Sequence, residues 1–146
     1  MNKTIKIVES GNLTEHFKLS EFYCNTDNEM LISKAFIYDF LPTLEEFRKW
    51  YNRPITPTSG YRTARLNKAV GGSSNSSHLK SLAVDFLYPA EYNKWTKERK
   101  QQFLNNVKAK WTDLAHAKGY KSQVNFYNNR FHLGFGSGRD SFLDYR

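Results

Sequence analysis

The sequence predicts an α+β domain, in which helices pack on a small and mostly antiparallel sheet. Long segments with apolar residues at helical spacing alternate with short apolar segments typical of strands. The last two short segments are separated only by a turn, which favours antiparallel pairing. The length of 146 residues fits one domain, and we expect residues 1–146 to form it.

The first long helix is predicted over residues 28–51. Pro42 interrupts the segment, so we expect a kink or a break into two helices there. Pro54 closes the segment. Apolar residues recur three or four positions apart and form one stripe, which consists of Ile32, Phe36, Phe40, Leu44, Phe47 and Tyr51.

Several short elements follow this helix. Residues 55–59 predict a strand, and residues 64–70 predict a short helix. Residues 71–77 read GGSSNSS, which is typical of a loop and is too short to separate two domains. Residues 82–88 predict the next strand by their length and composition.

The C-terminal part predicts a long helix and a hairpin. The helix spans about residues 92–118, with Leu104, Val107, Trp111 and Leu114 on one face, and Gly119 marks its end. Strands are predicted over residues 123–127 and 131–136. Asn128 and Asn129 between them are typical turn residues.

The formal net charge of +8 favours a negatively charged partner, such as nucleic acid, an anionic membrane surface or an acidic wall polymer. The chain contains no nucleic-acid-binding motif, so we expect it not to bind nucleic acid. The basic residues of the long helix are interpreted as a solvated face. Cys24 is the only cysteine, which excludes an intrachain disulfide, and we expect a buried thiol.

The location of the protein is predicted from what its segments lack. Residues 1–10 have no apolar core segment of the kind found in signal peptides, so we expect synthesis in the cytoplasm. No stretch approaches the ~20 apolar residues of a membrane span, so we expect no association with a membrane. We further expect a monomer.

Two of the four histidines have surroundings that indicate chemistry. His78 follows the Ser/Gly-rich loop, and Asp85 lies seven residues later inside an apolar strand, where a carboxylate needs a partner or a metal. His132 alternates with apolar residues and shares its face of the strand with Gly134 and Gly136, which leave open space beside the imidazole. His16 and His116 are interpreted as structural or solvent-facing.

Two imidazoles and one carboxylate would leave a fourth coordination position open, as in catalytic zinc sites. Imidazole ligands favour zinc over magnesium or calcium. A buried hydrogen bond between His78 and Asp85 explains the residue types equally well, so the residues alone leave both interpretations open.

The run SGYRTARLNKAVGGSSNSSHLKSLAVDF, residues 59–86, resembles the signature of the zinc D-Ala-D-Ala carboxypeptidase family. This family includes phage L-alanyl-D-glutamate endolysins and shares its fold with the hedgehog signalling domain. Residues 16–24 (HFKLSEFYC) and 124–135 (VNFYNNRFHLGF) resemble further segments of its phage branch. The resemblance implies a zinc peptidase with ligands His78, Asp85 and His132. It also implies that Arg62 stabilises the developing oxyanion and that Ser76 orients the substrate.

The chain departs from the family pattern at two positions. Ser81 occupies the usual place of a glycine. Asn129 occupies the place of the glutamate that serves as general base in the family's carboxypeptidases, and asparagine cannot take up the proton. Asp140, Asp113 and Asp144 are the remaining candidates, and we favour Asp140 because it follows the flexible stretch GSGR.

Two functions follow from the resemblance. The first is a zinc metallopeptidase that cleaves peptidoglycan stem peptides at the bacterial cell wall, where a protein of phage or prophage origin would act. The second is a non-catalytic zinc-binding domain of the same fold, which would serve as a wall-binding or virion component. The missing glutamate favours the second function.

Overall fold

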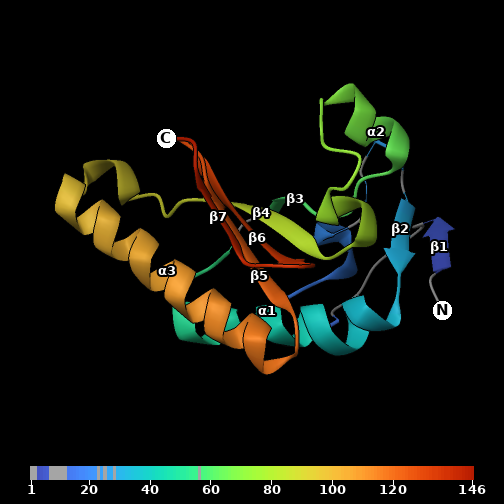
Figure 1. The fold of residues 1–146 in the computed structure, drawn as a ribbon, viewed down its shortest axis with the longest axis horizontal. Coiled ribbons are helices and arrows are strands. Elements are labelled where there is room, and N and C mark those ends of the chain that lie inside the picture. Colours follow the sequence, from blue (N-terminus) through green and yellow to red (C-terminus); the bar gives the residue numbers. More distant parts are fainter. Residues whose placement is uncertain (1–2, 7–12, 23, 25, 28, 56) are drawn as a thin grey trace.

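The computed structural model describes residues 3–6, 13–22, 24, 26–27, 29–55 and 57–146, and it confirms the α+β class (Figure 1). A small sheet pairs β1 (Lys3–Lys6) with β2 (Glu29–Ile32). The main sheet has five strands in the order β3-β4-β6-β5-β7. Its strands are β3 (Pro57–Ser59), β4 (Ala83–Leu87), β5 (Lys121–Phe126), β6 (Arg130–Gly136) and β7 (Ser141–Asp144).

The main sheet is mostly antiparallel, as predicted. β3 pairs with β4, β4 with β6 and β6 with β5, all antiparallel, whereas β5 and β7 run parallel. β7 was not predicted from the sequence. Its four residues, SFLD, are too few to show a clear alternation, and only their pairing with β5 makes them a strand.

The first long helix begins later than predicted. Residues Glu29–Ile32 form β2, so the prediction of helix from residue 28 is wrong there. A π-helix, Ala35–Phe40, continues directly into α1 (Leu41–Tyr51). Pro42 lies in the first turn of α1, where its missing N–H costs little, so the winding changes at this point and the helix is not interrupted.

The other two α-helices lie where the sequence predicted them, but some of their ends differ from the predicted ones. α2 spans Ala64–Ala69, and Thr63 caps its first turn by accepting a hydrogen bond from Leu66 N at 3.1 Å. α3 spans Lys97–Ala117, and Thr96 caps it in the same way. The predicted start at residue 92 belongs to a separate 3₁₀ helix, Tyr92–Lys94. None of the helices in the described ranges has the length and apolar character needed to cross a membrane.

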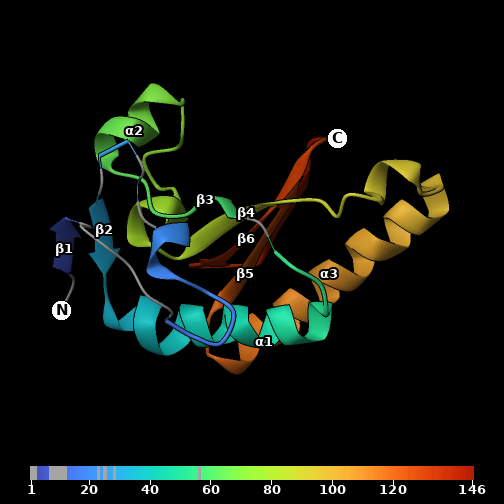
Figure 2. The ribbon, with the colours of Figure 1, turned by 180° about the vertical axis from the view of Figure 1, so that it is seen from behind.

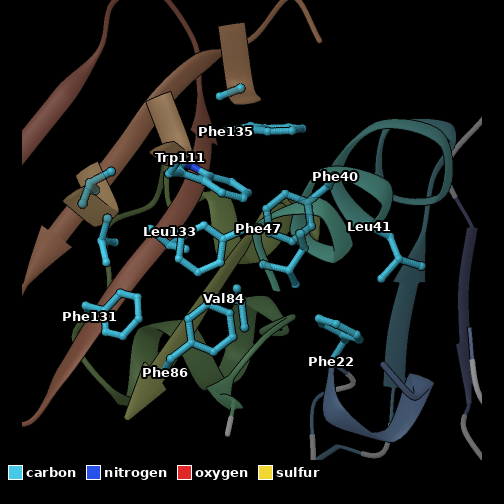
Figure 3. Packing of buried hydrophobic residues seen from close by; sticks show 14 of the residues in the cluster. Phe22, Phe40, Leu41, Phe47, Val84, Phe86, Trp111, Phe131, Leu133 and Phe135 are labelled. Atoms are coloured by element: carbon cyan, nitrogen blue, oxygen red, sulfur yellow. The ribbon is translucent and has the colours of Figure 1, made fainter. Parts of the chain in front are cut away.

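α1 and α3 lie together along one side of the main sheet, and α2 lies on the opposite side of the molecule (Figures 1 and 2). The hydrophobic core fills the space between the main sheet and the helices α1 and α3 (Figure 3). Trp111 of α3 is fully buried, and its Nε1 donates a hydrogen bond to the carbonyl of Gly134 in β6 at 2.9 Å. Aromatic rings of both helices and of β6 meet there, including Phe40, Phe47, Phe131 and Phe135.

Candidate metal centre

Strand alternation places a polar row on the face of the main sheet opposite the core. Asp85 lies between Val84 and Phe86, both of which belong to the core, so its side chain points to the other face. The register pairs Asp85 with His132 of β6, and His132 with Asn125 of β5. The side chains of Asp85, His132 and Asn125 therefore lie next to one another on this face of the sheet.

His78 is brought to this place by a short 3₁₀ helix, Ser77–Lys80. Ser76 caps the helix, since its Oγ accepts a hydrogen bond from His78 N at 3.2 Å. Ser77 Oγ donates to the carbonyl of Phe135 at 2.9 Å and ties the helix to β6. The Ser/Gly-rich loop thus ends in a capped 3₁₀ helix that Ser77 anchors to the main sheet.

His78, Asp85 and His132 are all buried, and one ligand atom of each lies within 4.8 Å of the others. The Nδ1 atom of His132 lies 2.9 Å from Oδ1 of Asp85, and Nε2 of His78 lies 3.3 Å from the same oxygen. The structure therefore brings together the three residues that the sequence singled out as ligands.

The outer nitrogen of each imidazole has its own partner. Nδ1 of His78 lies 2.6 Å from the carbonyl oxygen of Gly60, which can only accept, so this nitrogen carries the proton. Nε2 of His132 lies 3.2 Å from Oε1 of Gln123. Such partners orient metal-binding histidines and select the tautomer. They direct Nε2 of His78 and Nδ1 of His132 towards Asp85.

The protonation states suit a metal. Burial would raise the pKa of Asp85, but its contacts with His132 and His78 outweigh the effect of burial and hold that pKa well below the ordinary value. Burial lowers the pKa of His132 more strongly than Asp85 raises it. The site thus presents a carboxylate and a neutral imidazole, which are the forms that bind metal ions.

A zinc ion fits this donor set better than a hydrogen-bonded pair does. Without a metal, Nδ1 of His132 can donate to Asp85, but Nε2 of His78 carries no proton, is buried and has no hydrogen-bond partner among the described residues. A buried polar atom without a partner is costly unless something else contacts it. Two imidazole nitrogens and one carboxylate oxygen match the three-ligand sites at which zinc keeps an open position.

The three residues lie in a cleft of about 440 Å³. Arg62 extends into it, with Nη2 3.7 Å from Oδ2 of Asp85 and Nη1 donating to Oδ1 of Asn67 at 3.2 Å. The backbone N–H of Arg62 donates to the carbonyl of His78 at 3.0 Å. The cleft is further lined by Gly71, Gly72, Ser73, Asn75, Ser76, Ser77, Gln123, Asn125, Tyr127, Arg130, Ser141, Leu143 and Tyr145.

Asp140 does not line this cleft. Its carboxylate lies 2.9 Å from Nε2 of His116 and accepts a hydrogen bond from Ser122 N at the same distance. Asp144 pairs with Arg146 at 2.7 Å, and Asp113 of α3 also lies outside the cleft. Among the described residues that line the cleft, Asp85 is the only acid. The geometry therefore argues against Asp140 as the general base.

The space beside His132 depends on Gly134, as expected. A Cβ atom on Gly134 would lie 3.0 Å from Nε2 of His132 and 2.8 Å from Oε1 of Gln123, and one on Gly136 would lie 3.1 Å from Cγ of Gln123. The two glycines thus make room for the Gln123 side chain, and Gly134 also makes room for the imidazole of His132. Gln123 and Arg130 were missed as site residues because their approach depends on the register of β5 and β6, although the alternation in KSQVNFY could have indicated a polar face.

The other histidines have partners of their own. His16 Nδ1 lies 2.6 Å from Oε2 of Glu45, and the other oxygen of this buried carboxylate accepts from Thr14 Oγ1 and His16 N. His116 pairs with Asp140. Each of these histidines thus lies beside a carboxylate of the chain, and Cys24 is buried as expected.

Comparison with known proteins agrees with this geometry. Residues 15–123 match the family model described as Peptidase M15. The matched part includes Arg62, His78 and Asp85, and it ends before His132. No curated protein matches the chain.

Proposed function

We propose that this chain, which belongs to the peptidase M15 family, is a zinc peptidase that hydrolyses the stem peptides of peptidoglycan. The observation that carries the proposal is the meeting of His78, Asp85 and His132 in one cleft, with the unpartnered Nε2 of His78 directed at the other two ligands. The net charge of +8 supports an acidic polymer such as the bacterial wall as the target.

Each residue of the cleft has a defined part in this proposal. His78, Asp85 and His132 hold the metal, which would polarise a peptide carbonyl and supply a nucleophile at neutral pH. Arg62 stabilises the negative charge that develops on the carbonyl oxygen, because its positively charged guanidinium lies beside the ligand set. Asn67 orients Arg62, since its Oδ1 accepts from Nη1. Ser76 holds the 3₁₀ helix that carries His78.

The cleft also supports a second candidate function. Hydrolysis needs a proton acceptor, and such a base is typically worth ~10²–10⁴ in rate. Asp85 is the only acid among the described residues of the cleft and is committed to the ligand set. A zinc-binding domain that recognises wall peptides without cleaving them fits this observation.

The two functions are separated by an assay on purified peptidoglycan. Zinc-loaded wild type, Arg62→Gln and Asn129→Glu are incubated with the wall, and released peptides are identified by mass spectrometry. A peptidase releases defined fragments, and Arg62→Gln slows their release by about a hundredfold or more. A wild type without turnover that still binds the wall supports the non-catalytic function. Gain of turnover in Asn129→Glu would show that only the base is missing.

A further inference from the structure

We infer that Arg130 and Tyr127 form a subsite that binds a carboxylate group of the substrate next to the metal centre. The inference rests on the proposed function for the kind of polymer, and it narrows the ligand to an acidic peptide. It concerns the end of the cleft formed by β6 and β5.

Arg130 lies on the same face of β6 as His132, two residues before it. Its Nε is 3.9 Å from Oδ2 of Asp85, and its Cζ lies 4.1 Å from the centre of the Tyr127 ring. Tyr127 in turn stacks on Tyr145, with ring centroids 5.0 Å apart and planes at 15°. The guanidinium therefore rests on a stacked aromatic support and is held in place on one side of the ligand set.

Most donors of this guanidinium remain available. Within the described part of the chain, its hydrogen bond goes to Oδ1 of Asn129, at 3.3 Å. The 3.9 Å to Asp85 is too long for a hydrogen bond, so Asp85 attracts Arg130 without using a donor. The side chain is 38% exposed and lines the cleft, so a ligand can reach it.

The charges of the cleft also favour an anion. Nη2 of Arg62 lies 3.7 Å and Nε of Arg130 lies 3.9 Å from Oδ2 of Asp85. Among the described residues that line the cleft, Asp85 is the only acid. Two guanidinium groups and a divalent metal ion against one carboxylate leave an excess of positive charge. Arg62 is oriented by Asn67, whereas Arg130 has the freer fork. A planar fork binds a carboxylate through two parallel hydrogen bonds.

A peptidoglycan stem peptide offers such a group either at its C-terminus or on its glutamate residue. The test is calorimetric binding of zinc-loaded protein to three synthetic stem pentapeptides. One carries all its carboxylates, one has an amidated C-terminus, and one has an amide in place of the free carboxylate of the glutamate. Turnover is followed in parallel, so that peptide consumption does not distort the titration. Each variant is checked for zinc content and melting temperature before use.

Arg130→Gln should weaken binding of the full-carboxylate peptide by about tenfold to hundredfold, since charge-assisted hydrogen bonds are lost. Arg130→Lys, which keeps the charge but loses the fork, should recover only part of the affinity. The matched control is Arg139→Gln, an exposed arginine outside the cleft, which should bind like wild type.

One of the two amidated peptides lacks the carboxylate that Arg130 binds. That peptide should bind equally weakly to wild type and to Arg130→Gln, and its identity shows whether the carboxylate is that of the C-terminus or that of the glutamate. If Arg130→Gln weakens all three peptides by the same factor, or none of them, the subsite does not exist. A protein that binds in this carboxylate-dependent way but does not turn over would leave the subsite standing and refute the peptidase. Turnover that does not depend on Arg130, together with binding that does not depend on it, would support the peptidase and refute the subsite.

Discussion

Asp85 uses its two carboxylate oxygens on different neighbours. Oδ1 faces His78 and His132, and Oδ2 faces the guanidinium groups of Arg62 and Arg130. A carboxylate that is fixed from two sides can hold one oxygen towards a metal without rotating. The two arginines lie at distances that allow attraction without a hydrogen bond to Asp85. They therefore stabilise the charge of Asp85, and within the described part of the chain only one donor of each is used, on Asn67 and on Asn129.

Gln123 is expected to set the zinc affinity, although it is not a ligand. Its Oε1 lies 3.2 Å from Nε2 of His132 and fixes the orientation of that imidazole. Gln123→Ala should weaken zinc binding by about tenfold to a hundredfold, because loss of such a partner leaves the ligand free to rotate. Competition with a chelator of known affinity measures this effect. Gln102→Ala, at an exposed position of α3, is the control, and an equal loss in both variants would contradict the prediction.

At the scale of the elements, β6 connects the core to the metal centre. Phe131, Leu133 and Phe135 point into the core, whereas Arg130 and His132 point into the cleft. α3 fixes this strand through Trp111, which is fully buried and donates to the carbonyl of Gly134. Packing on the core face of the sheet therefore fixes the position of His132 on the opposite face.

Trp111→Phe should lower the free energy of unfolding by about 1–3 kcal/mol, because the strand loses a buried hydrogen-bond donor and some packing. Trp111→Ala should cost about 3–5 kcal/mol. Urea unfolding monitored by circular dichroism gives both values. Trp50→Phe, at a ring that is 42% exposed, should change stability by less than about 0.5 kcal/mol. Equal effects at the two tryptophans would contradict this account of β6.

At the scale of the whole molecule, the fold and the metal centre draw on different residues. The apolar cluster joins α1, α3 and the inner face of the sheet, and none of the three candidate ligands belongs to it. The three candidate ligands meet on the outer side of the sheet. In small metal-dependent domains that unfold without their ion, by contrast, the ligands hold the core together.

Removal of the metal should leave the protein folded. Chelation is expected to lower the melting temperature, because the ion binds only the folded chain, but the circular dichroism spectrum at room temperature should stay the same. His78→Ala should melt at one temperature with and without added zinc. Loss of the spectrum on chelation would mean that the ion is part of the framework.

Acid should destabilise the metal-free protein. The pKa of His132 is lowered from 6.5 by burial, so below that pH the unfolded chain binds a proton that the folded chain does not. Stability conferred by this neutral histidine is therefore present above pH 6.5 and declines as the pH falls below it. The lowered pKa of Asp85 acts in the same direction, but only below its ordinary value of 3.8. Urea unfolding at pH 7.5 and 5.5 checks this, and His132→Asn should reduce the difference between the two.

The sequence was most informative where the pattern was local. The stripe from Phe36 to Tyr51 and the apolar face of α3 predicted two helices, because helical spacing is visible within a few turns. The start of the first helix was missed because residues 29–32 pair with β1, a contact that local spacing does not reveal. His78, Asp85 and His132 stood out as polar residues in apolar or glycine-rich surroundings. Gln123 and Arg130 did not, because they join the site only through the pairing of β5 with β6 and of β6 with β4.

The two imidazoles face Asp85 with opposite nitrogens, Nε2 from His78 and Nδ1 from His132. With zinc on these two nitrogens, the remaining N–H groups would be Nδ1 of His78, which faces the Gly60 carbonyl, and Nε2 of His132, which faces Oε1 of Gln123. Nuclear magnetic resonance can read this arrangement directly. The two ring protons should exchange slowly enough to be seen, and their couplings to ring carbons should assign one to a δ and the other to an ε nitrogen. Coordination of zinc through these two nitrogens would thus have a signature that can be recorded in solution, before any substrate is known.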